Sequence, residues 1–211
     1  MDNRYLWGLL LVGMFALSFG YGYFGDEENS ISEYIYMGEL DTYNFEVSEQ
    51  GDHFLNWSIA YYSDGSINYI KDYVTPYPYG PNELLDINLD NRFRKQFVDA
   101  KQVYITRDVY LDEKTDSEIV VSLLSIDRLV DKFKTDSILA SIEDNERSRQ
   151  LNLPVMTCDD ANENRMVIWL KEGSENKIYR ENDYCVVGEF IEGDDPNKVA
   201  TKIAYHIIGV M

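Results

Sequence analysis

The chain has 211 residues, enough for one domain or two small ones, and its 45% hydrophobic content excludes wholesale disorder. Its 38 acidic and 19 basic side chains give a formal net charge of −19. Because nucleic-acid binding needs a basic surface, this charge excludes nucleic acid as a partner. The charge is uneven, since residues 26–90 contain 14 Asp and Glu residues and one basic residue, Lys71.

An uncharged segment of 20 residues, from Tyr5 to Phe24, precedes this acidic region. A helix of that length spans roughly 30 Å, the thickness of the hydrocarbon core of a bilayer. Arg4 comes before the segment and acidic residues follow it, which places the N-terminus in the cytoplasm. The segment therefore predicts a membrane anchor within residues 1–25, a single-pass chain and an extracytoplasmic remainder.

Two alternatives for this segment stay open. Ala16-Leu17-Ser18 offers the small residues that signal peptidase prefers, which fits a cleaved signal peptide. A buried core helix is the other alternative. The anchor and the signal peptide both export the rest of the chain.

The chain has two cysteines, Cys158 and Cys185, and an even number in an oxidising compartment favours a disulfide. The alternative is a catalytic or metal-binding thiol, but no CxxC spacing exists and both histidines are distant in sequence. We expect His53 on the surface and His206 packed in a helix. Asn56 begins the one Asn-x-Ser sequon, a glycosylation site in cells that glycosylate exported proteins.

Residues 26–81 are predicted to form a β-rich, acidic region. Aromatic and β-branched residues are concentrated in four short runs, at 33–37, 43–47, 54–62 and 67–73. The tetrapeptide at 63–66 indicates a hairpin between the last two runs. Pro76, Pro78 and Pro81 then make a stretch that favours neither a helix nor a central strand.

Residues 82–211 follow a mixed α/β pattern. Strands are predicted at 102–106, 137–142, 166–170, 177–179 and 184–187. Thr115 and Glu118 form a capping-box signature before apolar residues at helical spacing, and a last helix begins at Asp195 or Asn197. The predicted fold class is α+β: a β-rich N-terminal half, and a mixed α/β C-terminal half with a right-handed βαβ unit, behind one transmembrane helix.

The 17 tyrosines are concentrated between residues 21 and 79. Tyrosine contributes a large contact area with a polar tip, which suits an interaction surface. The alternative is that the rings pack a small β core while their hydroxyls reach solvent. The candidates for such a surface are Tyr61, Tyr62, Tyr73, Tyr77 and Tyr79.

Three carboxylates, Asp108, Asp112 and Glu113, follow the strand predicted at 102–106. Ligands of open α/β sheets gather at the carboxyl ends of strands, and neighbouring carboxylates serve acid–base catalysis or hold a cation. A solvated loop is the competing interpretation. The sequence contains no nucleophile elbow, phosphate loop or zinc motif, so we predict no cofactor and no metal site.

Several short segments are similar to an uncharacterised family of small archaeal membrane-anchored extracytoplasmic proteins, over residues 40–211. They are LPVMTC at 153–158, VIWLKEG at 167–173, KIY at 177–179 and IGVM at 208–211. In that family an Asn-Cys-Ile strand precedes a helix that ends in an LGIM-like tetrapeptide, whereas two residues separate Asn182 from Cys185 here. The resemblance implies an archaeal origin, a Cys158–Cys185 pair and a full-length C-terminus, but no activity.

The sequence leads to three functional hypotheses. The first is a non-enzymatic domain outside the cell that binds another component of the envelope. The second is an exported hydrolase or cation-dependent enzyme that uses carboxylates near Asp108. The third is a structural role in a surface layer.

Overall fold

The computed structural model describes residues 32–63, 66–90, 92–109, 113–133 and 136–211; the side chains of residues 59–71, 113–116 and 136 are outside this description. The membrane anchor predicted within residues 1–25 also lies outside it. In the described part of the chain, no helix has the length and apolar character needed to cross a membrane. The anchor thus stays a prediction.

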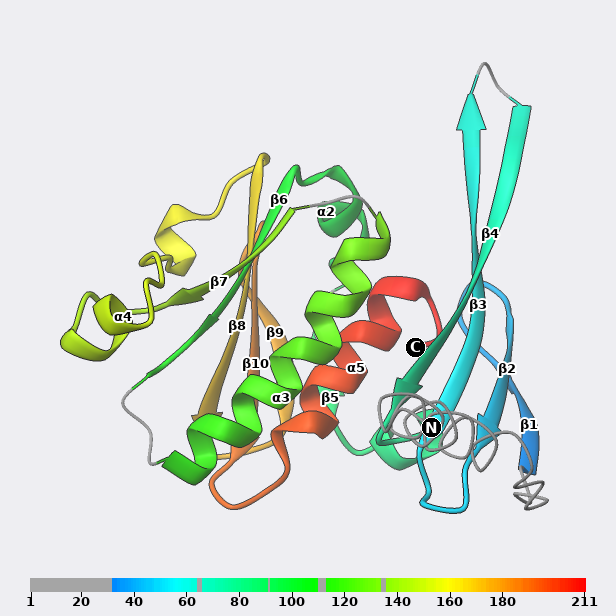
Figure 1. The fold of residues 1–211 in the computed structure, drawn as a ribbon, viewed down its shortest axis with the longest axis horizontal. Coiled ribbons are helices and arrows are strands. Elements are labelled where there is room, and N and C mark those ends of the chain that lie inside the picture. Colours follow the sequence, from blue (N-terminus) through cyan, green and yellow to red (C-terminus); the bar gives the residue numbers. More distant parts are fainter. Residues whose placement is uncertain (1–31, 64–65, 91, 110–112, 134–135) are drawn as a thin grey trace, which may run out of the picture. The chain divides into compact units, whose positions relative to one another are not determined.

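The first sheet is antiparallel, and its four strands lie in chain order (Figure 1). They are β1 (Ser32–Met37), β2 (Thr42–Val47), β3 (His53–Ser63) and β4 (Ser66–Tyr77). The ladder between β3 and β4 runs from the His53–Tyr77 pair to the Ser63–Ser66 pair, which confirms the predicted hairpin. Pro76 lies inside β4, so the strand continues into the proline stretch. Proline is tolerated there because β4 is an edge strand.

Where side chains of the first sheet are described, they alternate between a more buried and a more exposed face, as a half-covered strand requires. The buried face is aromatic and includes Tyr43, Phe45, Trp57 and Tyr77. These residues belong to one hydrophobic core that also includes residues of the helices and of the rest of the described chain. This face needs a partner, because the sheet has nothing of its own with which to cover it.

The second sheet is mixed and has six strands in the order β5-β9-β10-β8-β6-β7. Neighbouring strands from β10 to β7 are parallel, and β9 is antiparallel to β10. The bounds are β5 (Asn88–Leu89), β6 (Gln102–Arg107), β7 (Asp136–Ser141), β8 (Arg165–Gly173), β9 (Lys177–Asn182) and β10 (Cys185–Ile191). All five strands predicted in this half exist, and the fold is the mixed α+β class that we expected.

3₁₀ turns and helices lie between these strands, and one more helix, α5, follows the last strand. They are η1 (Pro81–Leu84), α2 (Arg94–Asp99), α3 (Glu113–Val130), η2 (Asp131–Phe133), α4 (Glu146–Gln150), η3 (Cys158–Asp160) and α5 (Pro196–Ile208). The long helix α3 joins the parallel strands β6 and β7, as the βαβ prediction requires, but it begins at Glu113, two residues before Thr115. Helices α3 and α5 lie side by side on one face of the second sheet (Figure 1).

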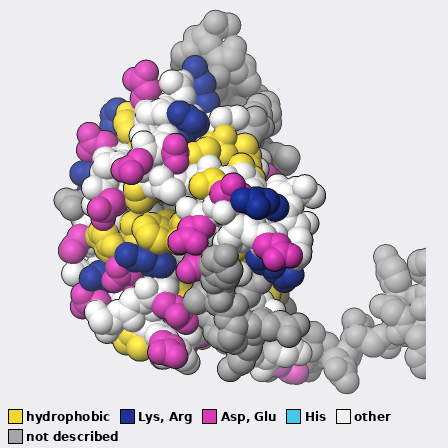
Figure 2. Space-filling view, turned by 90° about the vertical axis from the view of Figure 1, so that its left-hand side faces the viewer, with side chains coloured by type: hydrophobic (Ala, Val, Ile, Leu, Met, Phe, Trp, Pro, Cys, Tyr) yellow, Lys and Arg dark blue, Asp and Glu magenta, His cyan; other side chains and the backbone are white. Residues whose placement is uncertain are grey.

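The other face of the second sheet carries α4 and η3 (Figure 1). On this side of the molecule, hydrophobic side chains gather among acidic and basic ones (Figure 2). The apolar layer beneath η3 includes Val167, Cys185 and Val187, each at most 1% exposed. This face is therefore partly covered rather than fully buried.

Helix α5 is the centre of the fold. Asp195 caps its N-terminus, and Gly209, with φ of 90°, ends it in the left-handed conformation. Every residue from Val199 to Ile208 is buried, so this part of the helix is covered on all of its sides. The helix approaches β10 so closely that a Cβ at Gly188 would lie 2.7 Å from Val199 Cγ1.

The opposite side of α5 packs against the first sheet. The Tyr205 ring lies 5.8 Å from the Phe45 ring and 4.8 Å from the Tyr77 ring, centroid to centroid. The Tyr43 hydroxyl donates to the carbonyl oxygen of Ile208 over 2.7 Å. Both sheets thus share one helix, and Ser32–Met211 form one compact unit.

Candidate functional site

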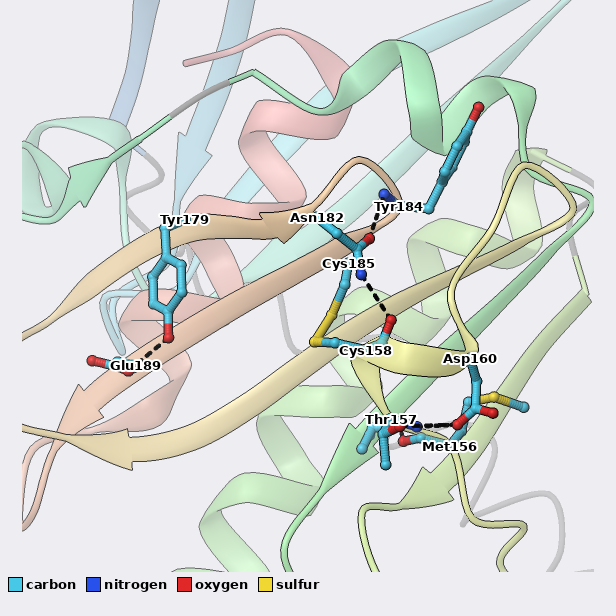
Figure 3. The surroundings of a disulfide bond; sticks show 10 residues. Met156, Thr157, Cys158, Asp160, Tyr179, Asn182, Tyr184, Cys185 and Glu189 are labelled. Carbon is cyan, nitrogen blue, oxygen red and sulfur yellow. Dashed lines mark hydrogen bonds between the residues drawn. A yellow bond between two sulfur atoms is a disulfide. The ribbon is translucent and has the colours of Figure 1, made fainter.

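A disulfide joins Cys158 of η3 to Cys185, the first residue of β10 (Figure 3). Their Cα atoms lie 5.2 Å apart, 27 residues apart in sequence. Cys185 is fully buried. The bond therefore fastens the segment before β8 onto the partly covered face of the second sheet.

Hydrogen bonds hold this segment on both sides of the disulfide (Figure 3). Asn182 Nδ2 donates to the Cys158 carbonyl over 2.7 Å, and Asn182 Oδ1 accepts from the Tyr184 amide over 2.9 Å. The amide and hydroxyl of Thr157 both donate to Asp160 Oδ2, over 2.9 and 3.0 Å. These two bonds lower the pKa of the Asp160 carboxyl. The covering segment is therefore held by polar contacts as well as by the covalent bond.

Beside this segment, three strands present one group of aromatic and charged side chains, which we call the aromatic–lysine face. Its members are Trp169 and Lys171 of β8, Lys177 and Tyr179 of β9, and Glu189 of β10. Alternate residues along a strand point to the same face, so these positions share the side of the sheet away from α3 and α5.

Glu189 is the centre of this face. Its carboxylate accepts the Tyr179 hydroxyl over 2.9 Å (Figure 3) and pairs with Lys171 and Lys177 over 3.0 and 3.1 Å. Only 10% of its side chain is exposed, against 28% for Lys171 and 26% for Lys177. The carboxylate is thus a buried anchor that fixes three more accessible groups.

The charges on this face are stabilised. Burial alone would raise the pKa of the Glu189 carboxyl, but hydrogen bonds from Lys171, Tyr179 and Lys177 outweigh it, and the pKa is lowered. Bonds to Glu175 and Glu189 raise the pKa of Lys177 to about 12. An acid–base catalyst works best with a pKa near the working pH, and these shifts lead away from neutrality. The arrangement suits binding better than proton transfer.

Each lysine also lies against an aromatic ring. The Lys171 ammonium is 4.7 Å from the centroid of the Trp169 ring, and that of Lys177 is 5.4 Å from the Tyr179 ring. Rings and lysines therefore hold one another in place, which gives a preorganised surface.

Three of the five candidate tyrosines have described side chains, and these three do not form one exposed surface. Tyr77 is 1% exposed, so the prediction is wrong for this residue: it points to the inner face of the first sheet. The ring of Tyr73 is half-buried and stacks on Trp57, with 5.0 Å between centroids. The half-buried Tyr79 donates its hydroxyl to Asp195 over 2.6 Å. The side chains of Tyr61 and Tyr62 lie outside the described residues.

The structure describes the other candidate residues only in part. Asp108 directly follows β6, as predicted, but Asp112 and the side chain of Glu113 lie outside the described residues. Asn56 lies on the outer face of the first sheet, and its Nδ2 donates to Glu46 over 2.9 Å. Among the described residues, no three His, Cys, Asp or Glu side chains come together as a metal site.

The aromatic–lysine face was not predicted from the sequence, although the spacing of its residues indicates part of it. Trp169 and Lys171 are two residues apart in one strand, and Lys177 and Tyr179 are two apart in the next, so each pair shares a face. What the sequence does not show is that β10 lies between them and supplies Glu189. Searches with this chain matched no protein-family model, no curated protein and no solved structure.

Proposed function

We propose that the chain is a non-enzymatic binding domain, attached to the outer side of the membrane through residues 5–24, that binds another component of the cell envelope. The aromatic–lysine face is its contact surface. The observation that carries this proposal is the cluster around Glu189, which holds two rings and two lysines in fixed positions. The Cys158–Cys185 disulfide supports an oxidising compartment.

The physical argument concerns preorganisation. Binding costs free energy when flexible side chains become ordered, and the long lysine side chains are the most costly. Here Glu189 orders Lys171 and Lys177 before any partner arrives. Trp and Tyr are enriched where interfaces derive most of their binding free energy. The face thus combines contact area from Trp169 and Tyr179 with two ordered ammonium groups, whose remaining N–H donors can bond an acidic group on the partner.

The experiment is crosslinking in native membranes with matched surface variants. Trp169→Ala is expected to reduce a stoichiometric crosslinked product at least tenfold, because truncating a central aromatic residue commonly costs about 2 kcal/mol of binding free energy. Lys171→Gln tests the charge. Val74→Ser is the control, since Val74 is 62% exposed on the outer face of the first sheet.

Circular dichroism of each variant separates lost binding from lost folding. Equal crosslinking of Trp169→Ala and Val74→Ser would disprove the assignment of the face. A clean monomer in every crosslinking condition would disprove the binding function itself.

A further inference from the structure

A cavity of about 520 Å³ lies where α2 meets β9 and the end of α5. Its cationic lining contrasts with a chain that has twice as many acidic as basic residues. The residues of interest are Arg92, Arg94, Lys95 and Arg180, with Asp99 and His206. Arg180 is two residues from the buried Ile178 in β9, so this cavity lies on the helix-covered side of the sheet and is separate from the aromatic–lysine face.

Arg94 is fixed in this cavity by the end of α5. Its Nε donates to the carbonyls of His206 and Ile207, each over 3.0 Å, and its Nη2 donates to that of His206 over 2.7 Å. A guanidinium has five N–H groups, so donors remain after these bonds. Glu39 pairs with Arg94 only at 3.7 Å. The guanidinium is thus held rigidly and is weakly neutralised.

Arg180 has little compensation for its charge. Its Nη1 is 3.5 Å from Asp183, whose side chain is 84% exposed. The Gln96 amide group satisfies both its oxygen and its nitrogen in one orientation. In that orientation its oxygen accepts from the same Nη1 over 3.0 Å. The buried Nε finds no hydrogen-bond partner among the described residues. A charged group with an unmet buried donor is destabilised, and a nearby anion would offset part of that cost.

Two further cations lie at the mouth of the cavity. Arg92 is 79% exposed and pairs with Glu39 at 3.0 Å, while Lys95 is 85% exposed and pairs with Asp99 at 2.7 Å. Exposed ion pairs contribute little to stability, so these two side chains exchange their carboxylate for a stronger anion at low cost. The cavity therefore combines a fixed guanidinium (Arg94) and a weakly paired one (Arg180) inside with two movable cations outside.

We propose that this cavity binds a small soluble oxyanion, a phosphate- or carboxylate-bearing molecule, between Arg94 and Arg180. Guanidinium groups match the paired oxygens of both anions, which is the chemistry that the two share. Arg92 and Lys95 close over the bound anion. The ligand is independent of any partner at the aromatic–lysine face, so failure of one proposal leaves the other intact.

The NMR signals of His206 can report whether an anion occupies the cavity, because His206 lines it. The chain contains only one other histidine, His53, so the signals are simple to assign. The experiment titrates the folded protein with inorganic phosphate or citrate and follows both imidazoles by NMR, with potassium chloride at matched ionic strength as the baseline. We expect a saturable shift of the His206 signals that chloride does not reproduce. Arg180→Gln and Arg92→Gln should each weaken binding at least tenfold.

Arg149→Gln is the matched control, since Arg149 pairs with Asp144 on an exposed surface elsewhere. Arg92 is so exposed that its variant keeps the fold even where Arg180→Gln does not. The proposal is overturned if phosphate and citrate shift the His206 signals no more than chloride does. It is also overturned if Arg92→Gln and Arg180→Gln bind these anions as tightly as the control variant does. Vesicles of anionic phospholipid are a third probe, and binding to them alone would contradict a soluble ligand.

Discussion

The two sheets cover the same helix with different side chains. The antiparallel first sheet meets α5 with aromatic rings, of which Phe45 and Tyr77 contact Tyr205 directly. The mixed second sheet meets it with aliphatic residues such as Val186 and with Gly188, whose missing side chain lets the helix approach. Large rings give the first sheet a wide contact area with the helix, whereas the missing side chain of Gly188 allows close packing of the helix on the second sheet.

This difference implies that the two sheets depend on α5 unequally. The second sheet has α3 as well as α5 on its helical face, while the described part of the first sheet relies on α5 and on Phe133 of η2, which stacks on Trp57 at 5.8 Å. A two-layer unit needs an apolar partner for each buried face. Loosening α5 should therefore affect the first sheet more than the second.

The largest expected effect comes from Tyr205→Ala. This change removes a fully buried ring that contacts both Phe45 and Tyr77, and the hydroxyl that donates to the Tyr79 carbonyl over 2.7 Å. Truncating a buried aromatic residue to alanine typically costs about 3–5 kcal/mol of unfolding free energy. Guanidinium unfolding measures the total loss, and hydrogen exchange should show it mostly as lost protection in β2 and β3.

Tyr205→Phe is the matched control for this experiment. It keeps the ring and removes one hydrogen bond, so a loss of about 1 kcal/mol is expected. If Tyr205→Ala exposes β8 and β10 to exchange as much as β2 and β3, the unequal dependence on α5 is wrong.

The second prediction acts on the other sheet. Replacing both Cys158 and Cys185 with alanine removes a bond between residues 27 apart, for which the chain-entropy model gives a loss of about 3.5 kcal/mol. Faster exchange is expected in η3 and at the start of β10, with β1 to β4 unchanged. A reducing agent should destabilise the wild type equally and leave the double variant unaffected. Wild-type stability in the double variant would rule out this role of the disulfide.

Local sequence patterns were enough to predict the class of fold and every strand of the described chain except the two-residue β5. The runs that became β3, β6 and β8 carry period-2 or continuous apolar patterns, and Asp195, one of the two starts considered for the last helix, is its N-cap. These signals are local, because strand pleating and helix capping depend on residues a few positions apart. The disulfide followed from counting cysteines in a chain that is expected to be exported.

Contacts between residues that are far apart along the chain could not be predicted from the sequence. Lys202 is 6% exposed in α5, and its ammonium donates to the carbonyls of Leu84 and Ile87, which are 118 and 115 residues away. No pattern in the sequence shows that these carbonyls are available to a buried lysine. Tyr77 was misassigned for the same reason, since its burial depends on Tyr205. Both candidate binding sites likewise combine side chains from separate elements.

The smallest effect expected concerns His206, on the side of α5 that faces α2. Its Nε2 accepts the Phe93 amide over 3.2 Å, so the ring is neutral and its Nδ1 donates to the Met211 oxygen over 2.9 Å. Burial lowers the pKa of His206, and the bond to Met211 only partly opposes this. A lowered pKa means that the unfolded chain binds a proton more readily, so stability is complete above about pH 6.5 and falls as the pH drops below it.

The linked loss is at most about 1.4 kcal/mol at pH 5.5, one unit below the ordinary histidine pKa. Carboxylates titrate in the same range, so the measurement is the difference between wild type and His206→Gln in urea unfolding at pH 7.5 and 5.5. Glutamine does not titrate, and the variant should lose less stability on acidification than the wild type does. Because protonation of Nε2 breaks the bond from Phe93, the protection of that amide relative to an unfolded chain at the same pH should fall in acid before that of any amide of the first sheet. If the unfolding free energies of the wild type and of His206→Gln depend equally on pH, His206 takes up its proton without loosening α5. The prediction of a pH effect through this helix would then be wrong.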